Sequence, residues 1–260
     1  MGMHFGILVA ELPWSQFFPL LSSLTGRFVD QGPVASVAKV DDLEDLDLDP
    51  TPEGNAVIAG GYAGQSYVLD TSMMMSMTGA DFIVELSRRA NTLVIGCGAE
   101  TMSGSYSFLA VRSGEVIRHF FDCQALLAEP LDEGETLMTE DDMPLEDLDG
   151  KGLIAALGSF GFDFAGWLKD GERQRYLYTA EEAKDDDDSG VLLKGPLAEV
   201  LADHYAENVL AEDERPSIMM FTRDAVTGQI VSQQDTGLRL GDEELSNPEF
   251  WNRFWNRLSN

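Results

Sequence analysis

The feature that most constrains the fold is a succession of short apolar runs between residues 56 and 123, separated by tight turns that contain glycine. Two alternating runs, Ala56–Ala59 and Ser66–Asp70, flank a glycine-rich turn. Two more, "SYSFLAVRS" and "EVIRHFFDC", meet at Ser113–Gly114. Such pairs are typical of β-hairpins, in which neighbouring strands run antiparallel. We therefore predict one antiparallel sheet from Ala56 to Cys123.

Helical segments lie between and around these strands. "ADFIVELSRRAN" has Asp81 in its first turn, Arg88 and Arg89 in its last, and Asn91 as a left-handed stop. A first strand, "HFGILVAEL", leads into a helix that Pro13 opens, and "LIAALGSFGFDFAGWL" predicts another apolar helix. Mixed strands and helices with adjacent hairpins predict an α+β fold, a largely antiparallel sheet with helices packed on it.

The acidic run "EEAKDDDDSG" divides the chain into two parts. We predict an α+β core domain at residues 1–180 and an acidic linker at 181–190. The remaining residues, 191–260, read as a helix, a hairpin and a second helix. Whether this C-terminal helix-hairpin-helix segment packs on the core is left open.

Charge restricts the partners that the chain can bind. It holds 46 acidic and 17 basic residues, a net charge of −29. Nucleic acids and anionic membranes are themselves negative, so neither is an expected partner. The N-terminus lacks a basic leader, no run reaches the roughly 18–20 apolar residues of a membrane span, and two cysteines make no disulfide framework. These features predict a cytoplasmic protein.

Cys97 is the strongest candidate for chemistry, in the stretch "VIGCGAETMSGSY". A catalytic cysteine needs a base within reach, and His119, on a neighbouring predicted strand, is the candidate. Cys97, His119 and Cys123 also suggest a metal triad. However, structural zinc ligands usually occur in close pairs, and an apolar run that ends in cysteine is typical of a buried strand. The buried interpretation is favoured, and Cys97 and His119 stay the catalytic candidates if the protein is an enzyme.

Other motifs fail on spacing. "GGYAGQS" lacks the lysine and the spacing of a phosphate loop, and "GCGAETMSG" lacks the third glycine of a dinucleotide fingerprint. A calcium loop with Gly150 at its sixth position would begin at Leu145 and end at Ala156, neither of which supplies a ligand. The sequence therefore predicts no cofactor and no metal site, and it assigns no enzymatic activity.

The C-terminal segment carries a wide aromatic stripe at helical spacing, formed by Phe250, Trp251, Phe254, Trp255 and Leu258. The stripe either packs on the protein's own core or enters a groove of a partner. Tryptophan is a preferred anchor at protein interfaces. Trp251 and Trp255 are therefore candidate partner-binding residues.

Acidic residues cluster rather than spread. Three stretches, Asp41–Asp49, Glu129–Asp149 and Glu181–Asp188, hold 22 of the 46. Clustered charge suits recognition of a basic protein, and we select Asp141, Asp142, Glu146 and Asp147 as candidate contacts.

The predicted function is an acidic binding or inhibitor protein, of the kind in which an immunity protein neutralises a toxin or nuclease. One alternative is a small enzyme that uses Cys97 and His119. The other is an ordinary protein of a salt-adapted organism, since lysine numbers 5 against 12 arginines. The oligomeric state is not predicted.

Overall fold

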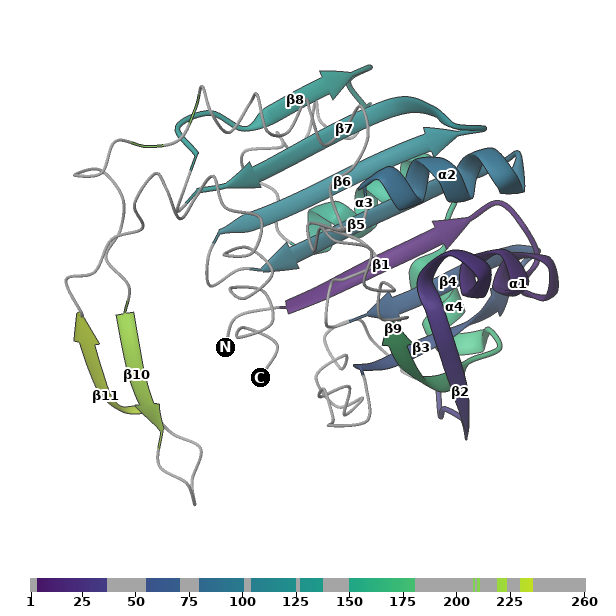
Figure 1. Ribbon diagram of the computed structural model, residues 1–260, viewed down its shortest axis with the longest axis horizontal. Helices are drawn as coiled ribbons and strands as arrows, with labels where there is room; N and C mark the ends of the chain where they lie inside the picture. The colour runs from purple at the N-terminus through teal and green to yellow at the C-terminus, as the bar shows by residue number, and fades with distance from the viewer. Residues whose placement is uncertain are drawn as a thin grey trace, which may run out of the picture.

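The computed structural model describes residues 4–36, 55–70, 80–100, 104–124, 127–137, 150–180, 208, 210, 219–223 and 230–235. In these ranges, one large sheet carries helices on both faces (Figure 1). The helices are α1 (Trp14–Thr25), α2 (Ala80–Ala90), α3 (Gly150–Ser159) and α4 (Phe164–Asp170). The strands of the sheet are β1 (His4–Ala10), β2 (Gly26–Pro33), β3 (Asn55–Tyr62), β4 (Gln65–Asp70), β5 (Leu93–Glu100), β6 (Ser105–Arg112), β7 (Glu115–Cys123), β8 (Leu131–Gly134) and β9 (Gln174–Ala180).

The nine strands follow the order β2-β9-β3-β4-β1-β5-β6-β7-β8, and every neighbouring pair is antiparallel. This confirms the predicted α+β class and its antiparallel sheet. The first strand of the chain occupies the centre, between β4 and β5. Its side chains Phe5, Ile7, Leu8 and Val9 are all buried, as a strand covered on both faces requires.

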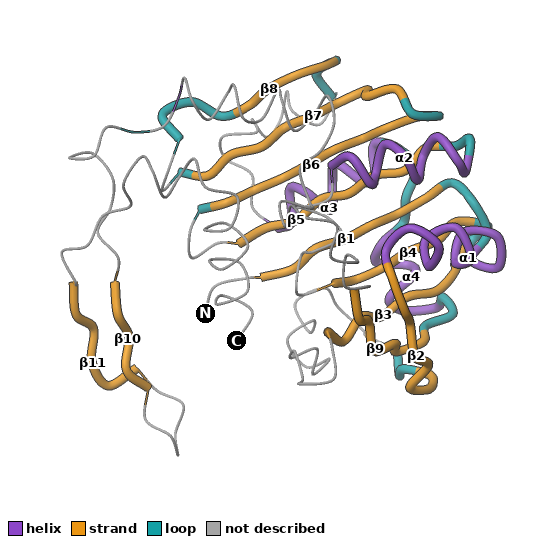
Figure 2. The backbone as a smooth tube through the Cα atoms, viewed as in Figure 1, coloured by secondary structure: helices purple, strands orange, loops and turns teal. Residues whose placement is uncertain are grey.

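Two hydrophobic cores lie on opposite faces of the sheet. Alternate residues of β1 belong to different cores, since successive strand residues point to opposite faces. One core joins Leu8 and Ala10 to α1 and α2, and the other joins Ile7 and Val9 to α3 and α4. We call these the α1/α2 face and the α3/α4 face; Figure 2 shows the helices in these layers.

The predicted turns have the geometry that their residues favour. Ala63 and Gly64 connect β3 to β4 with φ of 50° and 81°, and Ser113 and Gly114 connect β6 to β7 with φ of 53° and 89°. Two consecutive positive φ values mark the type I′ turns that match the twist of a hairpin. Asn91, with φ of 49°, ends α2 as predicted.

One predicted helix is divided, and two strands lie where the sequence predicts none. The single apolar helix predicted near residue 160 is two helices, because Gly161 takes a φ of 84° and the Asp163 carboxylate caps α4 by accepting a hydrogen bond from the Gly166 amide. Strand β2 follows α1 directly and pairs with β9, which lies far along the chain. Strand β8 lies within the acidic stretch Glu129–Asp149, in which the sequence indicates no strand.

The C-terminal part is described only for a hairpin. Strands β10 (Met219–Arg223) and β11 (Ile230–Asp235) pair antiparallel, as the predicted hairpin requires. The predicted linker at 181–190 and both predicted C-terminal helices lie outside the described residues. Among the described helices, none is long and apolar enough to cross a membrane.

Candidate functional site

Cys97 is in the core of the α3/α4 face. It pairs with Ile7 on β1 and with Phe108 on β6, and all three side chains belong to the same buried cluster. Burial raises the pKa of the Cys97 thiol far above its ordinary value. Because the thiolate is the nucleophilic form, this environment opposes catalysis by Cys97.

His119 lies on the other face of the sheet. It pairs with Leu109, whose side chain belongs to the core of the α1/α2 face. Its Nδ1 is 4.0 Å from the Glu133 carboxylate on β8. The structure therefore separates Cys97 and His119 by the thickness of the sheet, and they do not form a nucleophile–base pair.

Cys123 shares the face of His119 but lies four residues along the same strand, roughly 13 Å away at the rise of a β-strand. It accepts a hydrogen bond of 3.2 Å from the Ser105 hydroxyl. The residues of the possible metal triad are thus spread over both faces of the sheet. Within the described ranges, no three His, Cys, Asp or Glu side chains are grouped in a geometry that would hold a metal ion.

We predict that native protein reacts slowly with a polar thiol reagent at Cys97, because the side chain is fully buried and its thiol stays protonated. Cys97→Ala should lower the free energy of unfolding by about 1–2 kcal/mol through lost contacts and a small cavity. Labelling of the Cys123→Ala variant isolates Cys97, and urea-unfolded protein gives the reference rate. A native rate equal to the unfolded rate would contradict the prediction.

A buried polar patch occupies one end of the α1/α2 face. Four paired residues form one row across the sheet: Asp70 on β4, Gly6 on β1, Gly98 on β5 and Ser107 on β6. Glu100 lies two residues beyond Gly98 on β5 and therefore on the same face. The carboxylates of Asp70 and Glu100 are both buried and both take part in interactions. Because these acids are inaccessible, they are not a surface on which a partner could dock.

Exposed acids instead gather at the β7–β8 edge of the sheet. Side chains of Asp132 and Glu133 on β8 are 60% and 44% exposed, and Glu115 and Glu135 lie close by and are exposed. The Arg118 guanidinium, only 1% exposed, forms an ion pair with Asp132 and donates a 2.8 Å hydrogen bond to the Glu133 carbonyl. The buried Arg118 guanidinium thus holds β8 through the Asp132 carboxylate and the Glu133 backbone, while the side chains of Asp132 and Glu133, on opposite faces of the strand, stay partly exposed.

A hollow of about 600 Å³ adjoins this edge. It forms because β8 pairs only with residues 118–121 of β7, so that β7 continues beyond its partner. The hollow is lined by Arg112, Ser113, Glu115, Val116, Ile117, Gly134 and Glu135. We call these residues, with Asp132 and Glu133, the acidic edge.

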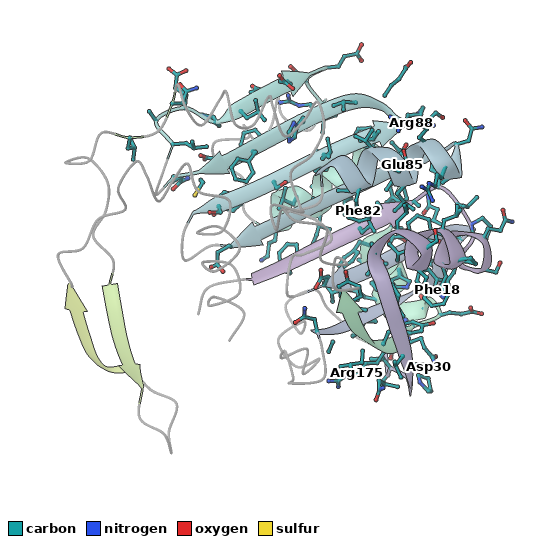
Figure 3. The ribbon with its side chains drawn as sticks, in the orientation of Figure 1. Phe18, Asp30, Phe82, Glu85, Arg88 and Arg175 are labelled. Carbon is teal, nitrogen blue, oxygen red and sulfur yellow. The ribbon has the colours of Figure 1, made fainter. Side chains whose placement is uncertain are left out.

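Arginines near the acidic edge are engaged within the chain. Arg112 contacts the Glu11 carboxylate at 3.0 Å. On α2, Arg89 and Arg88 both form ion pairs with Glu85 and lower the pKa of its carboxyl. Figure 3 shows Glu85 and Arg88 on this helix. By contrast, Glu115 and Glu135 make no ion pair with any residue that the structure describes. The field of the edge is therefore negative.

The partner-binding residues predicted from sequence lie outside the described residues. They are Asp141, Asp142, Glu146, Asp147, Trp251 and Trp255. Glu133 and Glu135 belong to the acidic stretch that the sequence marked, whereas Glu115 and Val116 do not. A strand of four residues is too short to show alternation, so composition was the available signal for β8.

No protein-family model, curated protein or solved structure matches the chain.

Proposed function

We propose that this protein binds a basic protein through its acidic surface and inhibits it, as an immunity protein neutralises a toxin or nuclease. The observation that carries the proposal is the distribution of charge. Three stretches, Asp41–Asp49, Glu129–Asp149 and Glu181–Asp188, hold 22 of the 46 acidic residues. Salt adaptation is expected to spread acid over the surface of the fold itself, so this concentration favours recognition.

The acidic edge supports the same proposal. Three of its acids, Asp132, Glu133 and Glu135, belong to the acidic stretch Glu129–Asp149, and its carboxylates lie at one edge of the sheet. Closely spaced exposed charges act together on a ligand that approaches within a Debye length of about 8 Å at physiological salt. A concentrated negative field raises association rates with a basic partner by roughly 10- to 1,000-fold at low salt.

The test uses the immobilised full chain as bait and the product of a neighbouring gene, if basic, as the ligand, because an inhibitor is expected to be encoded beside its target. We expect binding at low ionic strength that weakens steadily as salt rises. Neutralising Asp141, Asp142, Glu146 and Asp147 to the corresponding amides should slow association about tenfold. Stopped-flow or surface-based kinetics measure the rate.

The matched control neutralises the same number of acids in the run Asp185–Asp188 and should change the rate less than about twofold, because it alters net charge equally but elsewhere. Equal slowing by both variants, or binding that ignores salt, would overturn recognition by a directed patch. If the chain unfolds in dilute buffer and needs molar salt to refold, the salt-adaptation alternative replaces the proposal.

A further inference from the structure

We propose that the acidic edge receives an extended basic segment of the partner, which pairs as an added strand with the open edge of β7 at Glu115 and Val116. This inference rests on the proposed function and deepens it by naming the surface and the form of the ligand. Addition of a strand to a sheet edge is a common mode of peptide recognition, in which backbone hydrogen bonds give affinity and side chains give specificity.

Strand β7 has an open edge where it extends beyond β8. Strand β7 spans nine residues and β8 four, and the register pairs Arg118 with Gly134 as the last contact between them. After this point, the Glu135 amide donates a 3.2 Å hydrogen bond to the Ile117 carbonyl. The Ile117 carbonyl is therefore occupied, and among the described strands none pairs with Glu115 or Val116 on the side of β7 that faces β8. A strand edge of this kind offers backbone groups to another chain.

A bulge in β7 and a glycine after β8 keep this edge open. The pairing of β6 with β7 is irregular at this point: Ala110 pairs with Arg118, but the next residue, Val111, pairs with Val116. Ile117 is therefore the extra residue of a β-bulge. Gly134 has a φ of 93°, and a Cβ atom there would lie 2.2 Å from the Ile117 carbonyl oxygen. Glycine thus lets the chain turn away from β7 immediately after β8, and the hollow forms at the turn.

The hollow beside β7 is lined by both acidic and apolar side chains. Glu115 and Glu135 place two carboxylates on its lining, and its arginine, Arg112, is held by Glu11. Val116 also lines it and is 38% exposed, one of two large apolar side chains exposed among the described residues. A strand in which basic and apolar residues alternate would set its cations toward the carboxylates and its apolar side chains toward Val116.

The test is titration of the isotope-labelled full chain with a short capped peptide of alternating lysine and valine, followed by amide chemical shifts. We expect shifts concentrated at residues 115–117 and 133–136. A peptide of the same charge with proline at its centre should bind about tenfold more weakly, because proline removes a backbone donor and interrupts a strand. Equal affinity for the two peptides would overturn strand addition.

A pair of charge-matched variants locates the site. Glu115→Lys with Glu135→Lys should weaken binding of the alternating peptide about tenfold or more. Asp170→Lys with Glu172→Lys makes the same change in net charge near β9, six strand positions or roughly 29 Å from β7, and should change affinity less than about twofold. Equal weakening by both variants would overturn the assignment to this edge.

The two proposals fail separately. If the basic partner binds with salt dependence but the peptide shifts residues away from the β7–β8 edge, strand addition is wrong and recognition through acidic charge stands. If no basic partner binds, the proposed function fails whatever the peptide does. If the lysine variants do not fold, the comparison of the two peptides on the unmodified chain still decides the mode of binding.

Discussion

Trp167→Ala is expected to lower the free energy of unfolding by about 3–5 kcal/mol, the range for truncation of a fully buried large aromatic side chain. Trp167 has no exposed surface and stacks on Tyr67, with ring centroids 5.2 Å apart and planes inclined by 10°. Its indole Nε1 donates a 3.0 Å hydrogen bond to the Glu172 carbonyl. The change would leave a cavity between α4 and the sheet and would free that carbonyl.

Urea unfolding followed by far-ultraviolet circular dichroism measures this effect. Val29→Ala is the control, because Val29 is already 36% exposed on the edge strand β2 and should change stability by less than about 0.5 kcal/mol. Trp167→Phe should fall between the two, because it keeps a ring against Tyr67 and loses the hydrogen bond. A loss below about 1 kcal/mol for Trp167→Ala would mean that α4 is not fixed on the sheet as the structure describes.

Stability is expected to fall steeply as the pH rises from 10 to about 12, because ionisation of Tyr67 opposes folding. Burial raises the pKa of Tyr67 from 10.0 to about 12 in the folded protein. A raised pKa means that the fold favours the neutral phenol, so this contribution is complete below pH 10 and is lost as the pH approaches 12. Two pKa units correspond to about 2.7 kcal/mol. Burial also raises the pKa of Tyr178, which acts in the same direction.

The structure explains why Tyr67 resists ionisation. Burial against Phe162 and Trp167 is the main cause, because it disfavours the charged phenolate. The hydroxyl donates a 2.7 Å hydrogen bond to the Gln65 side chain, which ionisation would remove. The 3.1 Å hydrogen bond that it accepts from the Asp163 amide acts in the opposite direction and lowers the pKa, but its effect is smaller than that of burial. Tyr67→Phe should be less stable than the unmodified protein at pH 8 but should lose less stability between pH 10 and 12.

Urea unfolding at a series of pH values, with ultraviolet absorbance reporting phenolate, tests this expectation. Tyr62→Phe serves as the control, because Tyr62 is only half-buried. It should keep the alkaline loss of the unmodified protein. An unchanged loss in Tyr67→Phe would show that other groups cause the alkaline transition.

The acidic residues chosen for neutralisation, Asp141, Asp142, Glu146 and Asp147, do not belong to the described sheet or to its two cores. The acidic edge is where the described fold meets an acidic stretch. Separate roles for core and acid predict that neutralising Asp141, Asp142, Glu146 and Asp147 alters association without loss of folding.

Local features of the sequence determined much of the secondary structure. Ser113–Gly114 and the turn at Gly64 fixed two hairpins, because positive φ values and the twist of paired strands are encoded by a few adjacent residues. The apolar run that ends at Cys97 likewise indicated a buried strand, and the structure places that strand in the sheet. Asn91 marked the end of α2 for the same local reason.

The tertiary structure decided the rest. The central position of β1, the pairing of β2 with β9 and the short strand β8 depend on contacts between residues far apart in the chain, for which no local pattern carries the signal. The same holds for chemistry. Cys97 on β5 and His119 on β7 are separated by β6, and they lie on opposite faces of the sheet. Which face a residue occupies follows from strand register, and register is set by the burial of whole faces and by bulges such as that at Ile117.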